Sequence, residues 1–331
     1  MTMRFDLRVP PFANTTYAAQ YQAALDMVEW GEGIGVSTIT LSEHHGDVAG
    51  FMSAPLTVAA AVLARTKRVA VTISAALVPL HDPVRLAEQM ATIDCMAPGR
   101  LSVVLGAGYR KAEFEMAGIA RAQRGNLVEE CYQVCRTAWK GEPFTWRGRT
   151  VLVTPTPITP DGPHLSIGGK TEVAARRAAR LDAPFSPATA DPALSELYRS
   201  ECIRLGFEPR LEGMGKKPMG PGFVMISADP DATWKQISRF AFYDAETYAS
   251  WQDDTARSDW VVPQLQSVDD LRTSGRYLVL TPQQCIEQVR RDEGITLHPL
   301  MGGISPQLAW ESLHLFESAV LPHIGSATRT G

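Results

Sequence analysis

The alternation of strand-like and helix-like segments constrains the fold of this 331-residue chain more than any other feature of its sequence. Short apolar runs rich in β-branched residues are each followed by a longer segment whose apolar residues recur at helical spacing. Strands are predicted at residues 4–9, 37–41, 69–78 and 101–105, and helices at residues 17–33, 53–65 and 82–96, the last two capped by Ser53 and Asp82. Apolar strands that alternate with helices are typical of a parallel sheet with helices on its outer side.

The second half of the chain continues this pattern less regularly. Its predicted elements are helices at 126–139, 171–181 and 305–321, strands at 164–167, 219–227 and 295–300, and a hairpin at 144–153 that turns at Arg147-Gly148. The whole pattern gives about eight strand–helix units, which favours an α/β fold of the closed (β/α)8 TIM-barrel type over an open sheet. We therefore predict one domain over residues 1–331, with an irregular insertion at about 209–282 in its C-terminal half.

Charge and composition argue against several classes of protein. The net charge is −4 and the basic residues form no cluster, so we expect no nucleic-acid partner. No apolar run reaches the roughly 18 residues of a membrane span, and the N-terminal segment lacks the apolar core of a signal peptide. The five cysteines contain no Cys-x-x-Cys pair, which favours reduced, buried thiols. We expect a cytoplasmic protein that does not associate with a membrane.

Four unusual stretches follow or end predicted strands. In a parallel barrel, catalytic groups lie at the carboxyl ends of the strands, so these stretches should meet at one mouth of the barrel. They are Glu43-His44-His45, Ser74-Ala75-Ala76, Gly106-Ala107-Gly108-Tyr109 and Gly168-Gly169-Lys170-Thr171. Their convergence is a stronger indication of a site than any one of them alone.

The stretch Gly168–Thr171 opens a helix, and free N–H groups at a helix start suit a phosphate, to which Lys170 adds a charge. It is not a Walker motif, because His164 stands where the first glycine is needed, and a plain strand–helix turn stays the alternative. Gly106-x-Gly108 is not a dinucleotide fingerprint either, because Lys111 stands where the third glycine is needed. The chain therefore shows no motif for a tightly bound nicotinamide cofactor.

The acid and the two histidines at 43–45 raise the question of a metal ion. Adjacent side chains on an extended segment point to opposite faces, and the spacing matches neither a His-x-His nor a His-Glu-x-x-His motif. We therefore predict no metal ion. One histidine of the pair must then face the barrel mouth, where a group that titrates near neutral pH suits proton transfer.

In their order and spacing, these stretches resemble the bacterial luciferase-like, flavin-dependent monooxygenases and oxidoreductases. The resemblance covers nearly the whole chain. It rests on LSEHH at 41–45, ISAALVPLHDPVRLAEQMATIDCMAPGRL at 73–101, GAGYRKAEFEMAG at 106–118, FTWRGRTVLVTPTP at 144–157, HLSIGGKTEVAARRAARL at 164–181 and HPLMGGISPQLAWESLHLFESAVLP at 298–322.

The resemblance implies that FMN binds in its reduced form, as a co-substrate. Its phosphate would lie at Gly168–Thr171, where Arg124 best matches an arginine that the family supplies from the helix after the fourth strand. The isoalloxazine ring would lie against Ser74–Ala76 and Gly106, with His44 close to its reactive edge to assist proton transfer. The peptide bond between Ser74 and Ala75 is predicted to be cis.

The chain also departs from part of the family. The light-emitting enzymes carry a cysteine and an arginine where this chain has Gly106 and Ala107, so we predict no light emission and one cation fewer at the phosphate. Family members usually dimerise through the second and third helices. A homodimer is therefore predicted, with His45 and Glu88 at its interface.

Apolar side chains are expected to form the substrate pocket, which predicts a small apolar organic substrate: Val9, Phe12, Phe51, Tyr109 and the aromatic-rich segment 234–260. The primary hypothesis is a monooxygenase that receives reduced FMN from a separate NAD(P)H-dependent flavin reductase and uses O2. The absence of a dinucleotide fingerprint agrees with this hypothesis, because the reductase and not this chain would bind NAD(P)H. Two alternatives stay open: an oxidoreductase that transfers hydride with an 8-hydroxy-5-deazaflavin coenzyme, and a flavin-binding protein without catalytic activity.

Overall fold

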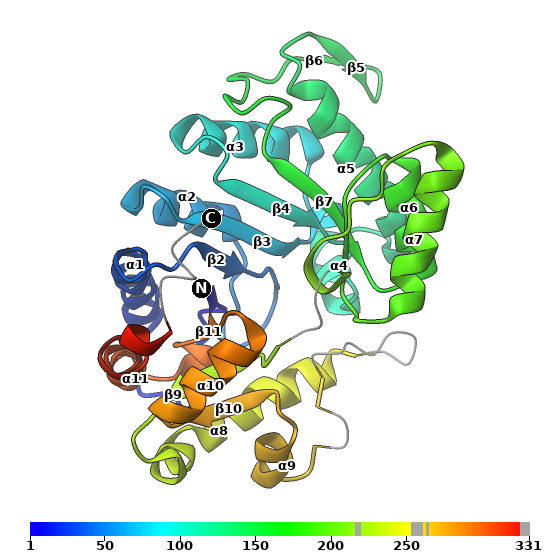
Figure 1. Cartoon of the computed structure of the whole chain (residues 1–331). Coiled ribbons are helices and arrows are strands. Elements are labelled where there is room, and N and C mark those ends of the chain that lie inside the picture. The colour runs from blue at the N-terminus through cyan, green and yellow to red at the C-terminus, as the bar shows by residue number, and fades with distance from the viewer. Residues whose placement is uncertain (216–219, 253–260, 263–264, 325–331) are drawn as a thin grey trace.

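A sheet of parallel strands forms the centre of the protein in the computed structural model, which describes residues 1–215, 220–252, 261–262 and 265–324 (Figure 1). The strands follow the order β11–β1–β2–β3–β4–β7–β8, and every neighbouring pair is parallel. Their bounds are Thr2–Phe5 for β1, Thr38–Leu41 for β2, Ala70–Ala76 for β3, Leu101–Leu105 for β4, His164–Gly169 for β7, Phe185–Pro187 for β8 and Thr296–Leu297 for β11. The predicted parallel sheet is confirmed.

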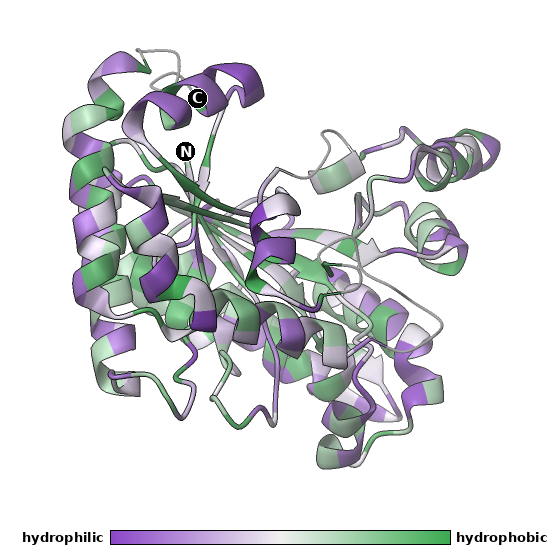
Figure 2. Ribbon diagram, turned by 90° about the horizontal axis from the view of Figure 1, so that it is seen from below, coloured by the Kyte–Doolittle hydropathy of each residue, from purple (hydrophilic) through white to green (hydrophobic). Residues whose placement is uncertain are grey.

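Helices connect these strands and cover the sheet, with apolar residues on the central strands and many polar residues on the helices (Figure 2). Their bounds are Tyr17–Gly33 for α1, Pro55–Arg65 for α2, Pro83–Met96 for α3, Arg124–Ala138 for α5, Glu172–Arg180 for α6, Pro192–Leu205 for α7, Pro282–Asp292 for α10 and Pro306–Ala319 for α11. Within the described ranges, no helix combines the length and the apolar character that crossing a membrane requires.

The range 209–282 is more regular than the sequence predicts. Strand β9 (Phe223–Ile226) pairs in parallel with β10 (Tyr277–Leu280), and helices α8 (Pro230–Ser250) and α9 (Val268–Thr273) lie against this pair. Buried apolar residues of α8, β9 and β10 form a second core cluster. The description of this range as irregular is therefore wrong, whereas its role as an insertion within a single domain stays a prediction.

The strands are arranged as in a TIM barrel, but their hydrogen bonds do not form a continuous ring in the part of the chain that the structure describes. The β9–β10 pair is separate from the seven-stranded sheet, although β9 contacts β11. The α/β fold of TIM-barrel type is thus confirmed, and a fully hydrogen-bonded closure is not observed among these residues.

The first half of the chain also contains a short hairpin, a short helix and a 3-10 turn. The antiparallel hairpin of β5 (Phe144–Trp146) and β6 (Arg149–Val151) turns at the predicted place. Helix α4 (Lys111–Ala117), which the sequence reading missed, follows β4, and the 3-10 turn η1 (Val78–Leu80) follows β3. Both lie after the carboxyl end of a central strand, where the candidate site is expected.

Capping residues explain where several helices begin. The side chain of Asp82 accepts hydrogen bonds from the backbone N–H groups of the first turn of α3, as predicted, and Pro83 follows it. Asp229 caps α8 in the same way. The prediction that Ser53 caps the second helix is wrong, because α2 begins at Pro55 after Ala54, which makes no side-chain cap bond.

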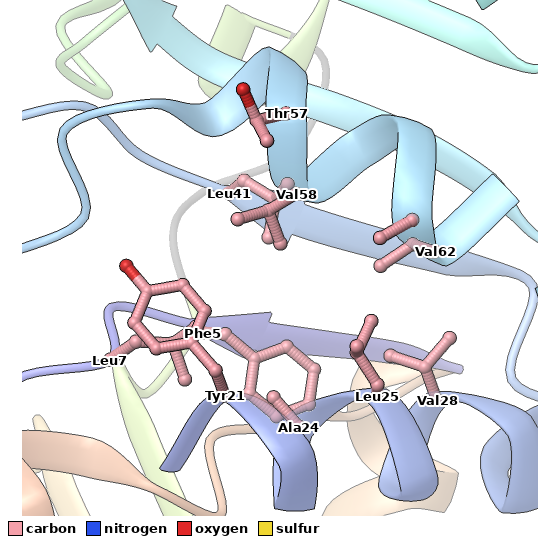
Figure 3. A pocket seen from close by; sticks show the side chains of 11 residues that line it. Phe5, Leu7, Tyr21, Ala24, Leu25, Val28, Leu41, Thr57, Val58 and Val62 are labelled. Atoms are coloured by element: carbon pink, nitrogen blue, oxygen red, sulfur yellow. The ribbon is translucent and has the colours of Figure 1, made fainter. Parts of the chain in front are cut away.

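An apolar cavity of about 160 Å³ lies between α1 and α2, over the outer side of β1 and β2 (Figure 3). Its lining is Phe5, Leu7, Tyr21, Ala24, Leu25, Val28, Leu41, Thr57, Val58, Ala61 and Val62. Successive side chains of a strand point to opposite faces, so Phe5 faces this cavity while Arg4 and Asp6 face the other side. The cavity is therefore separate from the barrel interior.

Candidate active site

His44 lies in a buried chamber of aromatic rings at the carboxyl end of β2. Its ring centroid is 4.7 Å from that of Phe51 and 4.6 Å from that of Trp251. Tyr109 and Tyr248 lie slightly farther away, with centroids at 6.0 Å and 6.1 Å. The imidazole is thus enclosed by apolar faces on several sides, and water has little access to it.

Glu113 holds this imidazole at its Nδ1 atom. Its Oε1 lies 3.1 Å from His44 Nδ1 and also accepts hydrogen bonds from the backbone N–H of His45 at 3.0 Å and from Arg110 Nη1 at 3.2 Å. The side chain of Glu113 is fully buried in the first turn of α4. A carboxylate at Nδ1 favours the tautomer with the proton on Nδ1, which leaves Nε2 as the atom available for proton transfer.

Burial lowers the pKa of His44, and the hydrogen bond and the charge of Glu113 offset this only in part. The imidazole is therefore biased toward its neutral form, which is the form that can accept a proton at Nε2. Burial also raises the pKa of Tyr109 and of Tyr248, so both phenols stay protonated.

Arg110 joins the aromatic chamber to Glu113. Its guanidinium carbon lies 3.9 Å from the ring centroid of Trp251, and its Nη1 donates to the carbonyl oxygen of His45 at 2.8 Å. A cation over an indole face is a favourable contact, particularly away from water. Arg110 therefore fixes Trp251, at the C-terminal end of α8, above the residues that follow β2.

Helix α8 is anchored by a buried network of charges beside the chamber. Arg8 forms an ion pair with Asp244, and Tyr277 donates to the same carboxylate at 2.5 Å. Arg8 Nε is also 3.1 Å from Asp6 Oδ2. Burial alone would raise the pKa of Asp6, but Arg8 and His298 beside it hold that pKa below its usual value. This network positions the helix that supplies Tyr248 and Trp251.

The end of β3 offers an accessible surface of small residues next to the end of β4. The peptide bond between Ser74 and Ala75 is cis, as the sequence reading predicts, and the pairing of β3 with β4 shifts register there. Ser74 is exposed although it lies in a central strand. A Cβ on Gly106 would come within 2.8 Å of the Cβ of Ala75, so only glycine fits beside this bend.

Gly168, Gly169, Lys170 and Thr171 lie where β7 ends and α6 begins. The hydroxyl of Thr171 accepts a hydrogen bond from Ala174 N at 3.3 Å and so caps the helix. A Cβ on Gly169 would lie 2.4 Å from the Cβ of Ala174, so glycine is required at this turn. The stretch is half-exposed to exposed, which leaves the start of α6 accessible to an anion.

Arg124 begins α5, and the adjacent residue packs against α6. A Cβ on Gly125 would come within 2.3 Å of Arg177 Nη2, and Arg177 Nε lies 3.1 Å from Glu129 Oε1. The first turn of α5 and helix α6 are therefore neighbours. The prediction that Arg124 and Lys170 both contact a flavin phosphate stays a prediction.

Val9 and Phe12, which were predicted to line the substrate pocket, contact segments near the chamber. Phe12 contacts Phe240 and Tyr243 of α8, with ring centroids 5.3 Å and 5.6 Å apart, and the backbone N–H of Val9 donates to the carbonyl of Ala49 at 2.8 Å. Arg8, with its guanidinium carbon 4.8 Å from the centroid of Phe51, links this group to the chamber.

The predicted interface residues lie away from the chamber. His45 turns from His44 toward Glu43, with 2.8 Å between His45 Nε2 and Glu43 Oε1, which confirms that the adjacent histidines point to opposite faces. That hydrogen bond raises the pKa of His45. Glu88 lies on α3 and forms an ion pair with Arg85.

Arg110 and Glu113 were not predicted as site residues, and Tyr248 and Trp251 were predicted only as part of the aromatic-rich segment 234–260. Signals for them were present. Arg110 and Glu113 belong to GAGYRKAEFEMAG at a strand end, and the aromatic-rich segment 234–260 was predicted to line the substrate pocket. Tyr248 and Trp251 of this segment lie beside His44, and Trp260 lies outside the described residues.

Solved structures with a similar fold include both oxygenases and a dehydrogenase. The monooxygenase RslO1 from Streptomyces bottropensis matches with a TM-score of 0.75 at 21% identity, over 98% of this chain and 100% of that one. The oxygenating constituent of 3,6-diketocamphane monooxygenase from Pseudomonas putida, solved with FMN, gives 0.67 at 18%, over 97% and 99%. An F420-dependent secondary alcohol dehydrogenase, solved with an F420-acetone adduct, gives 0.63 at 17%, over 93% and 97%. At these identities, the likeness establishes the fold.

The family itself is established by sequence. The chain spans only 37% to 40% of the length of the first curated relatives that it matches, at 27% identity. The family model described as luciferase-like monooxygenase, in contrast, matches residues 3–298, which is most of the chain. This protein therefore belongs to the luciferase-like monooxygenase family.

Proposed function

We propose that this member of the family is a two-component monooxygenase that uses reduced FMN, delivered by a separate NAD(P)H-dependent flavin reductase, and O2 to oxygenate a small apolar organic substrate. The observation that carries the proposal is the buried aromatic chamber around His44, in which Glu113 orients the imidazole. A water-poor chamber with one oriented acid–base group suits a reaction whose reactive species must be protected from water.

The described residues can accommodate both the phosphate and the isoalloxazine ring of a flavin. The start of α6 offers N–H groups, Thr171 and the cation of Lys170, a donor set that suits a phosphate, and Arg124 lies on the neighbouring helix α5. The exposed Ser74 and the small residues Ala75 and Gly106 leave room for a planar ring. The two regions lie at the ends of β3, β4 and β7, which are neighbours in the sheet.

When bound, reduced FMN supplies the electrons that activate O2. His44 Nε2 accepts or returns a proton beside the reacting atoms, while Glu113 keeps the ring in one tautomer and one orientation. Phe51, Tyr109 and Trp251 exclude water and present apolar faces to the substrate.

A hydride-transferring oxidoreductase with an 8-hydroxy-5-deazaflavin coenzyme is the second candidate, because the F420-dependent dehydrogenase has a similar fold. The two are separated by titrating the protein with reduced FMN and with the reduced deazaflavin under anaerobic conditions. We expect FMN to bind and its reoxidation by O2 to consume substrate. Binding of the deazaflavin alone would overturn the FMN proposal, and binding of FMN without any turnover would leave a non-catalytic flavin-binding protein.

We also propose that the protein is a homodimer through α2 and α3, with His45 and Glu88 at the interface. Both side chains retain some exposure in the single chain, which agrees with a surface that a second copy can cover. Sedimentation velocity of the wild type and of a Glu88→Arg variant tests this proposal, because the variant should be monomeric.

A further inference from the structure

Outside the His44 chamber, three side chains that can bind metal ions converge on one point. Glu43 Oε1 lies 2.8 Å from His45 Nε2 and 2.6 Å from His81 Nε2. The three potential ligand atoms all lie within 4.8 Å of one another. No other group of this kind occurs among the residues that the structure describes.

The fold fixes the carboxylate of this cluster and leaves the histidines accessible. Glu43 is 1% exposed, and its other oxygen, Oε2, accepts a hydrogen bond from Leu77 N at 2.7 Å. Oε1 is thereby aimed at the two imidazoles. In the single chain the side chains of His45 and His81 are 15% and 32% exposed, so an ion can reach the cluster from their side before a second copy covers His45.

We propose that Glu43, His45 and His81 bind one zinc ion. Two imidazole nitrogens and one carboxylate oxygen form the His2Glu ligand set that Zn²⁺ uses with a water molecule in the fourth position. The site would join the end of β2 to the segment between η1 and α3, beside the small-residue surface at the end of β3. It departs from the spacing-based prediction of no metal, because His81 lies 38 residues after Glu43 in the sequence.

The geometry requires only a small adjustment. Metal–ligand distances of about 2.0–2.2 Å in a tetrahedron place neighbouring ligand atoms roughly 3.3 Å apart. The two hydrogen-bonded contacts, at 2.8 Å and 2.6 Å, would therefore each open by about 0.5–0.7 Å. Glu43 can remain on Leu77 N while the two partly exposed histidines move outward.

The test uses untagged protein that has been treated with a chelator and contains no flavin. Calorimetric titration with Zn²⁺ should show one site per chain, and titration with Co²⁺ should give the visible absorption of a four-coordinate ion. Loss of a partner outside the ligand shell already costs about 10–100-fold in metal affinity. His81→Ala and Glu43→Gln, which remove a ligand and a charge, should therefore each weaken binding by more than about 100-fold.

His323→Ala is the matched control, because His323 is an exposed histidine outside the cluster, and its zinc affinity should equal that of the wild type. Circular dichroism of every variant shows whether the fold is retained. Absence of binding to the wild type overturns the proposal, and so does a site whose affinity is unchanged in both His81→Ala and Glu43→Gln. Since no flavin or oxygen is involved, failure here leaves the proposed monooxygenase function untouched.

Discussion

Replacing Glu113 by glutamine tests whether this carboxylate positions His44. The substitution keeps the size of the side chain but removes the charge that accepts three hydrogen bonds, from His44 Nδ1, His45 N and Arg110 Nη1. A hydrogen bond to a charged group contributes about 1.5–3 kcal/mol, against about 0.5–1.5 kcal/mol for a neutral one. At a loss of roughly 1 kcal/mol for each bond, the free energy of unfolding should fall by about 3 kcal/mol.

The same substitution should slow turnover without preventing flavin binding. With glutamine at position 113 the Nδ1 tautomer of His44 is no longer enforced, so much of the general acid–base contribution, about 10²–10⁴-fold, should be lost. We expect kcat to fall by about 10²-fold while KM changes little, because the aromatic walls of the chamber remain. Glu113→Asp, which restores the charge, should recover part of the rate.

The matched control is Glu115→Gln on the same helix. Glu115 is exposed and pairs with Lys111 at the surface, with 3.1 Å between Oε1 and Nζ. Surface substitutions of this kind usually change stability by no more than about 0.5 kcal/mol. Urea denaturation and steady-state kinetics of both variants give the comparison. If Glu113→Gln behaves as Glu115→Gln does, Glu113 has no role in positioning His44 and the reasoning is refuted.

Three further predictions concern the chamber, the phosphate and the buried charges. His44→Ala should leave flavin binding intact, measured by fluorescence, and slow oxygenation by about 10²–10⁴-fold; an unchanged rate would make the residue structural. Lys170→Ala or Arg124→Ala should weaken FMN by about 10–150-fold, the value of one charge-assisted contact, and riboflavin hardly at all; equal losses would place the phosphate elsewhere. Burial lowers the pKa of His298, with Asp6 opposing this only in part. The unfolded chain therefore takes up the proton first, and the free energy of unfolding should fall below about pH 6.5 by up to about 1.4 kcal/mol per pH unit. In urea titrations, His298→Gln should flatten this slope; an unchanged slope would contradict the assignment.

Local sequence signals were sufficient for much of the fold. The strands β2, β3 and β4 and the β5–β6 hairpin lie close to their predicted positions, because apolar runs and turn residues act over a few neighbouring residues. The start of α6 at Gly168–Thr171 was found for the same reason. Helix α8 was missed although Trp234, Ile237, Ala241 and Ala245 show helical spacing, because the polar residues between them obscured the stripe.

The contacts that define the candidate site could not be predicted in this way. Glu113 and His44 are 69 residues apart, and their meeting depends on the path of the chain after β4. The position of Trp251 beside His44 depends on how α8 is held in place. The buried ion pair between Arg8 and Asp244 fixes that helix. Composition shows that such charges exist in the chain, but only the packed fold shows which of them lose water together and must pair.

The adjacent histidines after β2 show how one strand end can serve two sites. Because successive side chains alternate in direction, His44 enters the aromatic chamber and meets Glu113, whereas His45 turns to Glu43 and His81. The backbone N–H and carbonyl of His45 nevertheless bind Glu113 and Arg110, so the two environments share a fixed backbone but no side-chain ligand. A substitution at His81 should therefore change the cluster around Glu43 and leave the orientation of His44 intact, which allows the two proposed sites to be tested independently.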